Sequence, residues 1–424
     1  MKGFLLKAHA KKASAKARER SAVSRAQLDG QSRQTTETKT SAFPTGKINQ
    51  TERDRSVLTD SSFDPREPRK EETVSDDKPP EKMSFFSMPQ PADADGTSAW
   101  LVGNKTAMAQ VIDSPGYPSR TPKPPRCDMT VFRQTIDQQK WGIFATGLIK
   151  SGELLFAERP LLVAPRSVPK HFRALPCPQY DDGRVMPLVL ETYERMLKLS
   201  LDRLPADRQK TFMELPNART ELAGYPILGT FFTNNFGIEN LKDNTTYDGY
   251  AGVCEMGSRF RHSCRPNIMQ RFNLASFSFQ FYAARDVEAN EELFYAFCGV
   301  EGSAASRKAR LAPYGIACKC SSCLNATPES DLLRTNFQSE IERLTEQTTE
   351  CWKTGNKIRP EVLGNMLKLE QDMIKEGLDG ISEFTAFLMV IGLTLKSMGQ
   401  SSVAETYLTR CKGVVGIIDG SASA

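Results

Sequence analysis

The hydrophobic residues of this chain repeat with two different periods, and the change of period divides the sequence. Phe277, Phe279 and Phe281 alternate with residues such as Ser278 and Gln280, which is typical of a half-buried strand. Beyond residue 324 the apolar positions recur at helical intervals instead. They form four stripes, at residues 333–344, 362–373, 384–395 and 403–411. The pattern predicts a β-rich part followed by a small array of antiparallel helices.

The β-rich part contains other short elements. Residues 141–146 and 153–158 are expected to form strands on either side of a turn, and residues 293–297 show the same two-residue alternation. Leucines recur at helical spacing within residues 187–215, until Pro205 interrupts them. We therefore expect short strands with a helical segment inserted among them.

The first 125 residues have a different composition. They are rich in charged residues, Ser, Thr and Pro, and poor in aromatic and branched residues, so we expect them to be disordered. The first thirty residues are basic and contain many alanines. This pattern fits a nuclear signal, a mitochondrial presequence or a solvated basic tail.

Composition narrows the classes of protein to consider. No run of 18 apolar residues occurs, so no membrane span is expected, and a net charge of +5 over 424 residues does not indicate a nucleic-acid binder. The N-terminus carries no secretory pattern. We expect an intracellular protein, and nuclear, cytoplasmic and mitochondrial destinations all fit.

Cysteine spacing gives the sharpest chemical signal. The chain has ten cysteines, and three of them, Cys318, Cys320 and Cys323, lie within six residues. In a reducing compartment such spacing favours metal binding over disulfides, although unrelated core cysteines are the alternative. Three thiolates leave a tetrahedral zinc ion one ligand short. With only three histidines in the chain, a catalytic site of several histidines is not expected.

Several ordered motifs resemble the SET-domain family of lysine methyltransferases. Residues 140–163 resemble its opening glycine-containing hairpin, and GSRFRHSCRPN at residues 257–267 resembles its Asn-His-Ser-Cys-x-Pro-Asn motif. Glu291-Glu292-Leu293 and the cysteines at residues 318–323 then follow in the family's order. The pattern is nearest to proteins of the SET-and-MYND type, without the MYND zinc module. The resemblance covers about residues 126–325.

This resemblance implies an α+β architecture, a mainly β SET fold whose segment after Glu292 threads beneath a loop as a pseudoknot. It implies a SET domain at residues 126–300 with a helical insert at about 164–225, a post-SET zinc segment at 301–325 and a helical C-terminal domain at 326–424. The zinc ligands would be Cys264, Cys318, Cys320 and Cys323. S-adenosylmethionine would be the methyl donor, and a lysine of a protein or peptide the acceptor.

The resemblance also assigns the residues around the cofactor. The cofactor-facing positions are Lys140, Trp141, Gly142, Arg261, His262 and Ile316. Lys140 replaces the first glycine of the family's Gly-x-Gly, and Arg261 replaces an asparagine. Ile316 replaces the aromatic residue that covers the adenine, and Phe297 replaces the catalytic tyrosine. Tyr295, about 6–7 Å away on the same strand face, is an alternative source of the missing hydroxyl.

Four changes around one ligand predict weakened cofactor binding or lost catalysis. The expected function is therefore a protein-lysine N-methyltransferase with a diverged active site. The alternative is a catalytically inactive SET-fold module that binds proteins, in the former lysine channel or on the C-terminal helices. Nucleic-acid binding through the basic N-terminus is a third hypothesis, which steep salt dependence would identify.

Overall fold

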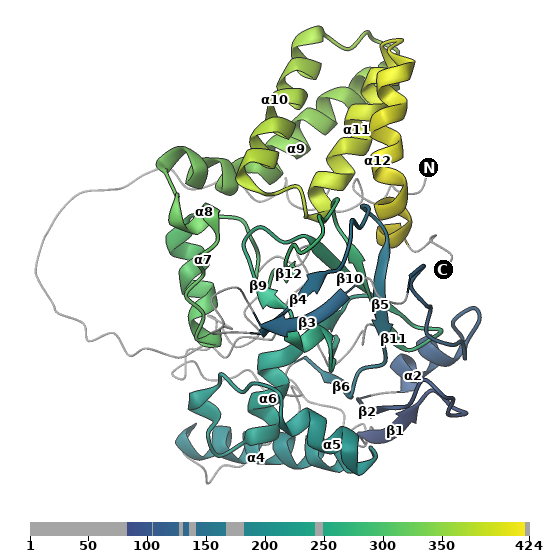
Figure 1. Cartoon of the computed structure of the whole chain (residues 1–424), viewed down its shortest axis with the longest axis vertical. Helices are drawn as coiled ribbons and strands as arrows, with labels where there is room; N and C mark the ends of the chain where they lie inside the picture. The colour runs from purple at the N-terminus through teal and green to yellow at the C-terminus, as the bar shows by residue number, and fades with distance from the viewer. Residues whose placement is uncertain are drawn as a thin grey trace, which may run out of the picture. The chain divides into compact units, whose positions relative to one another are not determined.

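The computed structural model describes residues 83–103, 105–126, 130–134, 141–166, 182–241 and 249–419 (Figure 1). All of them belong to one compact unit, Ala42–Ala424, and the other unit, Met1–Ser41, lies outside the described residues. The sheets and the many helices confirm the predicted α+β class with a helical C-terminal region.

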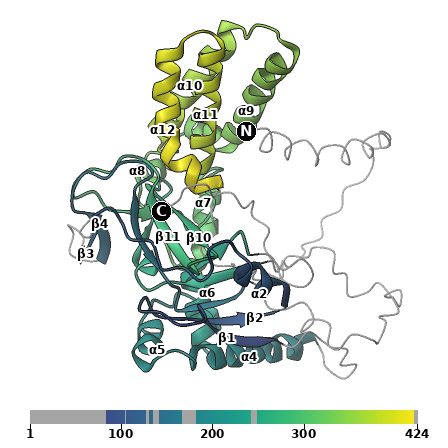
Figure 2. The same ribbon diagram turned by 90° about the vertical axis from the view of Figure 1, so that its right-hand side faces the viewer.

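A five-stranded sheet forms the first layer. Its strands in spatial order are β1 (Ser84–Met88), β2 (Ser98–Val102), β6 (Leu162–Pro165), β8 (Tyr250–Val253) and β7 (Asn235–Ile238). Strand β2 pairs parallel to β6, and the other neighbours are antiparallel. Three helices lie within or just after the expected insert: α4 (Asp182–Leu201), α5 (Ala206–Met213) and α6 (Pro226–Asn234). Their apolar side chains cover one face of the sheet, and Figure 2 shows α4 beside β1.

Strands β1 and β2 and helix α2 (Lys105–Ile112) lie in the region that composition predicted to be disordered. For residues 84–112 that prediction is wrong. The apolar residues there are few but concentrated: all five residues of β2 are buried, and Trp100 pairs with Val163 of β6. Residues 1–82 lie outside the described residues, so the predicted disorder remains a prediction for them.

A second, antiparallel sheet has the strand order β10 (Ile268–Asn273), β11 (Ser278–Ala283) and β5 (Leu154–Glu158). Strand β11 is buried on both faces, so the prediction of a half-buried strand is wrong here. Phe279 and Phe281 enter the main core, while Tyr282 on the other face packs in a separate cluster with Val414. The C-terminal helix therefore covers a face that the local pattern assigned to solvent.

Two short pairings hold the motif region together. Strand β3 (Thr130–Gln134) is antiparallel to β4 (Trp141–Ala145), and β9 (Arg261–His262) is parallel to β12 (Phe294–Tyr295). The parallel pair brings side by side two motifs that are 33 residues apart in sequence. Whether the segment after Glu292 threads beneath a loop stays a prediction.

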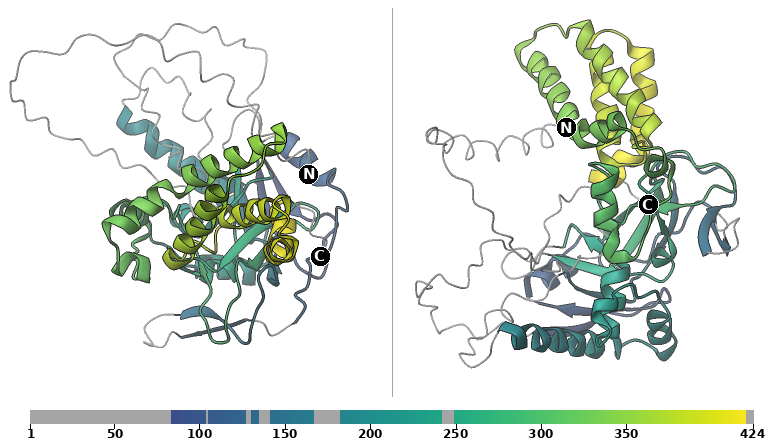
Figure 3. Two further views of the ribbon diagram at one scale, coloured as in Figure 1. Left: turned by 90° about the horizontal axis from the view of Figure 1, so that it is seen from above. Right: turned by 90° about the vertical axis from the view of Figure 1, so that its left-hand side faces the viewer.

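The C-terminal part is helical, and its four longest helices follow the four predicted stripes. They are α9 (Pro328–Thr354), α10 (Pro360–Glu376), α11 (Ser382–Ser397) and α12 (Ser401–Asp419). Met366, Phe387 and Ile391 are fully buried in their shared core, and Figure 3 shows the helices packed side by side. Two shorter helices, α7 (Ala304–Leu311) and α8 (Ser321–Leu324), lie between this array and the sheets in sequence. Among the described residues, no helix has the length and apolar content needed to cross a membrane.

Candidate functional site

The loop that carries the cysteine motif is fixed at its start by Glu158, the last residue of β5. The carboxylate of Glu158 accepts backbone hydrogen bonds from Glu255, Met256 and Gly257, at 3.0, 3.0 and 2.6 Å. A Cβ on Gly257 would overlap the ring of Phe281, so the close approach requires glycine. Sequence reasoning missed Glu158, although an acidic residue at the end of an apolar strand was a visible signal.

The structure brings together the four cysteines that the sequence analysis named. Their sulfur atoms all lie within 4.8 Å of one another, and Cys264 is buried. The Cys264 sulfur lies 4.0 Å from that of Cys318 and 3.6 Å from that of Cys323. A tetrahedral zinc ion with Zn–S bonds of about 2.3 Å places its sulfurs about 3.8 Å apart. Four free thiols at these separations fit a structural zinc ion.

Hydrogen bonds between the thiols of this cluster change the pKa values of its members in opposite directions. The hydrogen bond from the Cys264 thiol lowers the pKa of Cys318 to about 7, and the same bond raises the pKa of Cys264. A thiolate is therefore available in the cluster near neutral pH, and the thiolate is the form that binds metal.

His262 faces this cluster with its side chain. Its Nδ1 accepts the backbone N–H of Phe297 at 3.0 Å, and its Nε2 lies 3.4 Å from the sulfur of Cys264. Burial lowers the pKa of His262 to about 4, so the ring is neutral at physiological pH. Both ring nitrogens therefore make contacts within the protein, and the expected contact of His262 with a cofactor stays a prediction.

Three separate segments meet beside His262. Arg261 of β9 places Nη1 3.1 Å from both carboxylate oxygens of Glu292, and its guanidinium carbon lies 5.9 Å from the ring centroid of Phe294. A Cβ on Gly142 of β4 would overlap the same carboxylate. The Glu292 side chain therefore fills the space over Gly142 and neutralises Arg261. Lys140 and the side chain of Trp141 lie outside the described residues.

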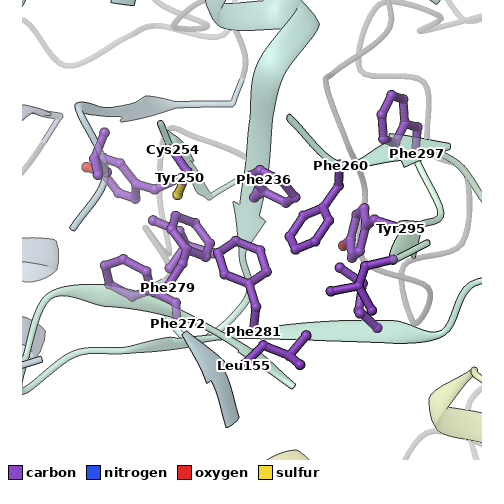
Figure 4. Packing of buried hydrophobic residues seen from close by; sticks show 14 of the residues in the cluster. Leu155, Phe236, Tyr250, Cys254, Phe260, Phe272, Phe279, Phe281, Tyr295 and Phe297 are labelled. Atoms are coloured by element: carbon purple, nitrogen blue, oxygen red, sulfur yellow. The ribbon is translucent and has the colours of Figure 1, made fainter. Parts of the chain in front are cut away.

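The two aromatic residues expected at the reaction centre have different surroundings. Tyr295 is 1% exposed and packs edge to face on Phe236, with ring centroids 5.3 Å apart. Figure 4 shows Tyr295 beside Phe260 in the aromatic core, with Phe297 farther out. The Phe297 ring packs edge to face against His262, with centroids 5.5 Å apart. Both residues belong to the same buried cluster, and of the two Tyr295 alone carries a hydroxyl.

Ile316 is partly buried and packs against the main core. Two residues earlier, Tyr314 is buried, with its ring centroid 5.9 Å from that of Phe297 and 4.7 Å from the guanidinium carbon of Arg219. Sequence reasoning missed Tyr314 and Arg219, because the stacking of residues 95 positions apart leaves no local signal.

Known proteins with similar sequences point to the same family that the motifs resemble. Residues 140–298 match the family model described as the SET domain. Over 118 residues the chain is 32% identical to "Histone-lysine N-methyltransferase set5" of Schizosaccharomyces pombe. That match covers 28% of this chain and 34% of the relative, so the chain spans about a third of the length of the curated relative it matches. The motif order, the fold and the family match agree that residues 140–298 form a SET domain.

Proposed function

We propose that this chain is a protein-lysine N-methyltransferase of the SET type that uses S-adenosylmethionine, binds it weakly and transfers its methyl group slowly. The family match supports the reaction class, and the name of the relative makes a histone lysine the first substrate to test. The proposal includes a structural zinc ion held by Cys264, Cys318, Cys320 and Cys323.

The observation that carries the inference of weak cofactor binding is the meeting of Gly142, Arg261 and Glu292 from three separate segments. Methyl transfer needs an electrophilic methyl group, which the cofactor supplies as a sulfonium. A carboxylate fills the space over Gly142, and an arginine stands where the family has a short amide. The described residues therefore fit the cofactor poorly in this arrangement, which is why we infer weak binding.

The experiment that tests this proposal compares the natural sequence with Arg261→Asn, Phe297→Tyr and the double variant. Isothermal titration with S-adenosylmethionine measures cofactor binding, and radiolabelled methyl transfer to histones and cell extract measures activity. We expect the double variant to gain about 100- to 1,000-fold in methyl transfer, because a positioning group of this kind contributes about 3–4 kcal/mol. Arg285→Asn is the matched control, since Arg285 pairs with the neighbouring Glu291, and it should leave cofactor affinity unchanged.

The results separate this proposal from its alternatives. Robust turnover by the natural sequence that Tyr295→Phe abolishes would show that Tyr295 supplies the hydroxyl. Absence of cofactor binding in every variant would contradict the methyltransferase proposal. It would favour a SET-fold module that binds a protein partner without catalysis, which the missing hydroxyl at Phe297 also favours.

A further inference from the structure

The ring of His262 connects two parts of the site through its two nitrogens. Because Nδ1 accepts the N–H of Phe297 at 3.0 Å, the hydrogen of the neutral ring is carried by Nε2. The Nε2–H then points to the sulfur of Cys264 at 3.4 Å. The ring is therefore a donor to one thiol of the cysteine cluster and an acceptor from the segment that follows β12.

Arg307 of α7 approaches the cluster from another side. Its side chain is fully buried, and Nη2 lies 3.1 Å from the carbonyl oxygen of Ser322 and 3.8 Å from the sulfur of Cys323. The carboxylate of Asp331, which is about one third exposed, is 4.0 Å from Nη1. A buried guanidinium needs nearby negative charge. Four thiolates around a divalent zinc ion leave two negative charges, which would supply it.

We propose that His262 and Arg307 are positioning residues of the metal centre, donating N–H groups to the sulfurs of Cys264 and Cys323. The inference rests on the proposed zinc site and extends it to residues outside the ligand set. It also gives His262 a role toward metal that the family resemblance does not assign, because the side chain faces sulfur. Through Nδ1 the same ring ties the metal centre to the backbone at Phe297.

The test uses the full chain loaded with Zn²⁺ or Co²⁺ and measures metal affinity by competition with a chromophoric chelator. His262→Asn keeps an acceptor near the Nδ1 position and removes the donor to sulfur, whereas His262→Gln keeps a donor near Nε2. We expect His262→Asn and Arg307→Met to weaken metal binding about 10- to 100-fold, and His262→Gln and Arg307→Lys to recover part of the loss. Arg310→Met is the matched control on the same helix, because Arg310 donates to the carbonyl of Gly299 at 3.0 Å.

The sulfur-to-cobalt charge-transfer band gives a readout that a merely structural role would not move. Donation from N–H groups lowers the electron density on sulfur, so its removal should shift this band to lower energy in His262→Asn and Arg307→Met. An unchanged affinity and band in both variants would overturn the inference while leaving the zinc site intact. A natural sequence that binds neither ion with a tetrathiolate spectrum would overturn the zinc site, and this inference with it.

Discussion

At the scale of single residues, the charged side chains beside residues 255–264 mostly form hydrogen bonds with backbone groups. Glu158 accepts three consecutive backbone N–H groups, and Arg334 donates to the carbonyl oxygens of Cys264, Val300 and Glu376. Burial of a charge is costly unless hydrogen bonds offset it. The cluster of cysteines could be predicted because three of its members are close in sequence. The backbone partners of Glu158 and Arg334 could not be predicted, because they lie 34 to 99 positions away.

Replacement of Glu158 by glutamine should lower the free energy of unfolding by about 1–3 kcal/mol, because the oxygens of a carboxyl group can accept the backbone N–H groups in either protonation state, whereas an amide N–H₂ cannot accept. Desolvation raises the pKa of Glu158 above 4.5, so the folded state binds its proton more readily than the unfolded state does. The advantage of the natural residue is therefore fully present below pH 4.5 and declines as pH rises through the folded-state pKa.

Urea unfolding of Glu158→Gln and of the natural sequence across this pH range measures the effect. Glu288→Gln, at an exposed position, is the control and should change stability by less than about 0.5 kcal/mol. Equal stability of Glu158→Gln and the natural sequence at every pH would contradict the role given to the carboxylate.

At the scale of elements, the C-terminal helices were predictable, and their attachment to the motif loop was not. Their stripes follow from helical periodicity, and α10 ends at Gly377, which adopts a φ of 73°. The carbonyl oxygen of Glu376, the last residue of α10, accepts both from Ser322, which lies between two zinc-ligand candidates, and from Arg334 of α9. Because these contacts cross between segments distant in sequence, no local pattern indicates them. The loop that carries Cys320 and Cys323 and the helical array therefore share one junction.

Arg334→Met should destabilise the protein by about 3–5 kcal/mol, since it removes the donor to the Glu376 carboxylate and to the carbonyl oxygens of Cys264 and Val300. Nε of Arg334 lies 2.7 Å from a Glu376 carboxylate oxygen, and the arginine side chain is fully buried. Arg343→Met on the same helix is the matched control. Its partner Glu340 lies on the exposed face, so a change below about 1 kcal/mol is expected. Thermal and urea unfolding of both variants give the comparison, and similar losses would argue against the junction.

At the scale of the whole molecule, composition placed the start of the folded part too late. Averaged over 125 residues the N-terminal region is polar, which hides the buried strand around Trp100. That strand lies between β1 and β6 in the five-stranded sheet, and the loop before it supplies Asp93 to Arg159, whose side chain is fully buried. Burial and pairing across the sheet, rather than mean composition, therefore decide where the folded part of the described chain begins.

A chain that begins at residue 83 should fold, whereas one that begins at residue 126 should aggregate or unfold. The shorter chain loses β1 and β2, which exposes the apolar edge of β6. It also leaves Arg159 without Asp93, to which its Nη2 donates at 2.6 Å.

The variant Asp93→Asn tests the ion pair alone and should lower the free energy of unfolding by about 1–3 kcal/mol, with Asp113→Asn at an exposed position as control. The hydrogen bond from Arg159 lowers the pKa of Asp93 below 3.8, so the difference should be present above that pH and vanish as the pH falls through the folded-state pKa. Size-exclusion chromatography and urea unfolding of the two truncated chains and two variants measure these outcomes, and a stable monomer from residues 126–424 would show that the N-terminal strands are dispensable.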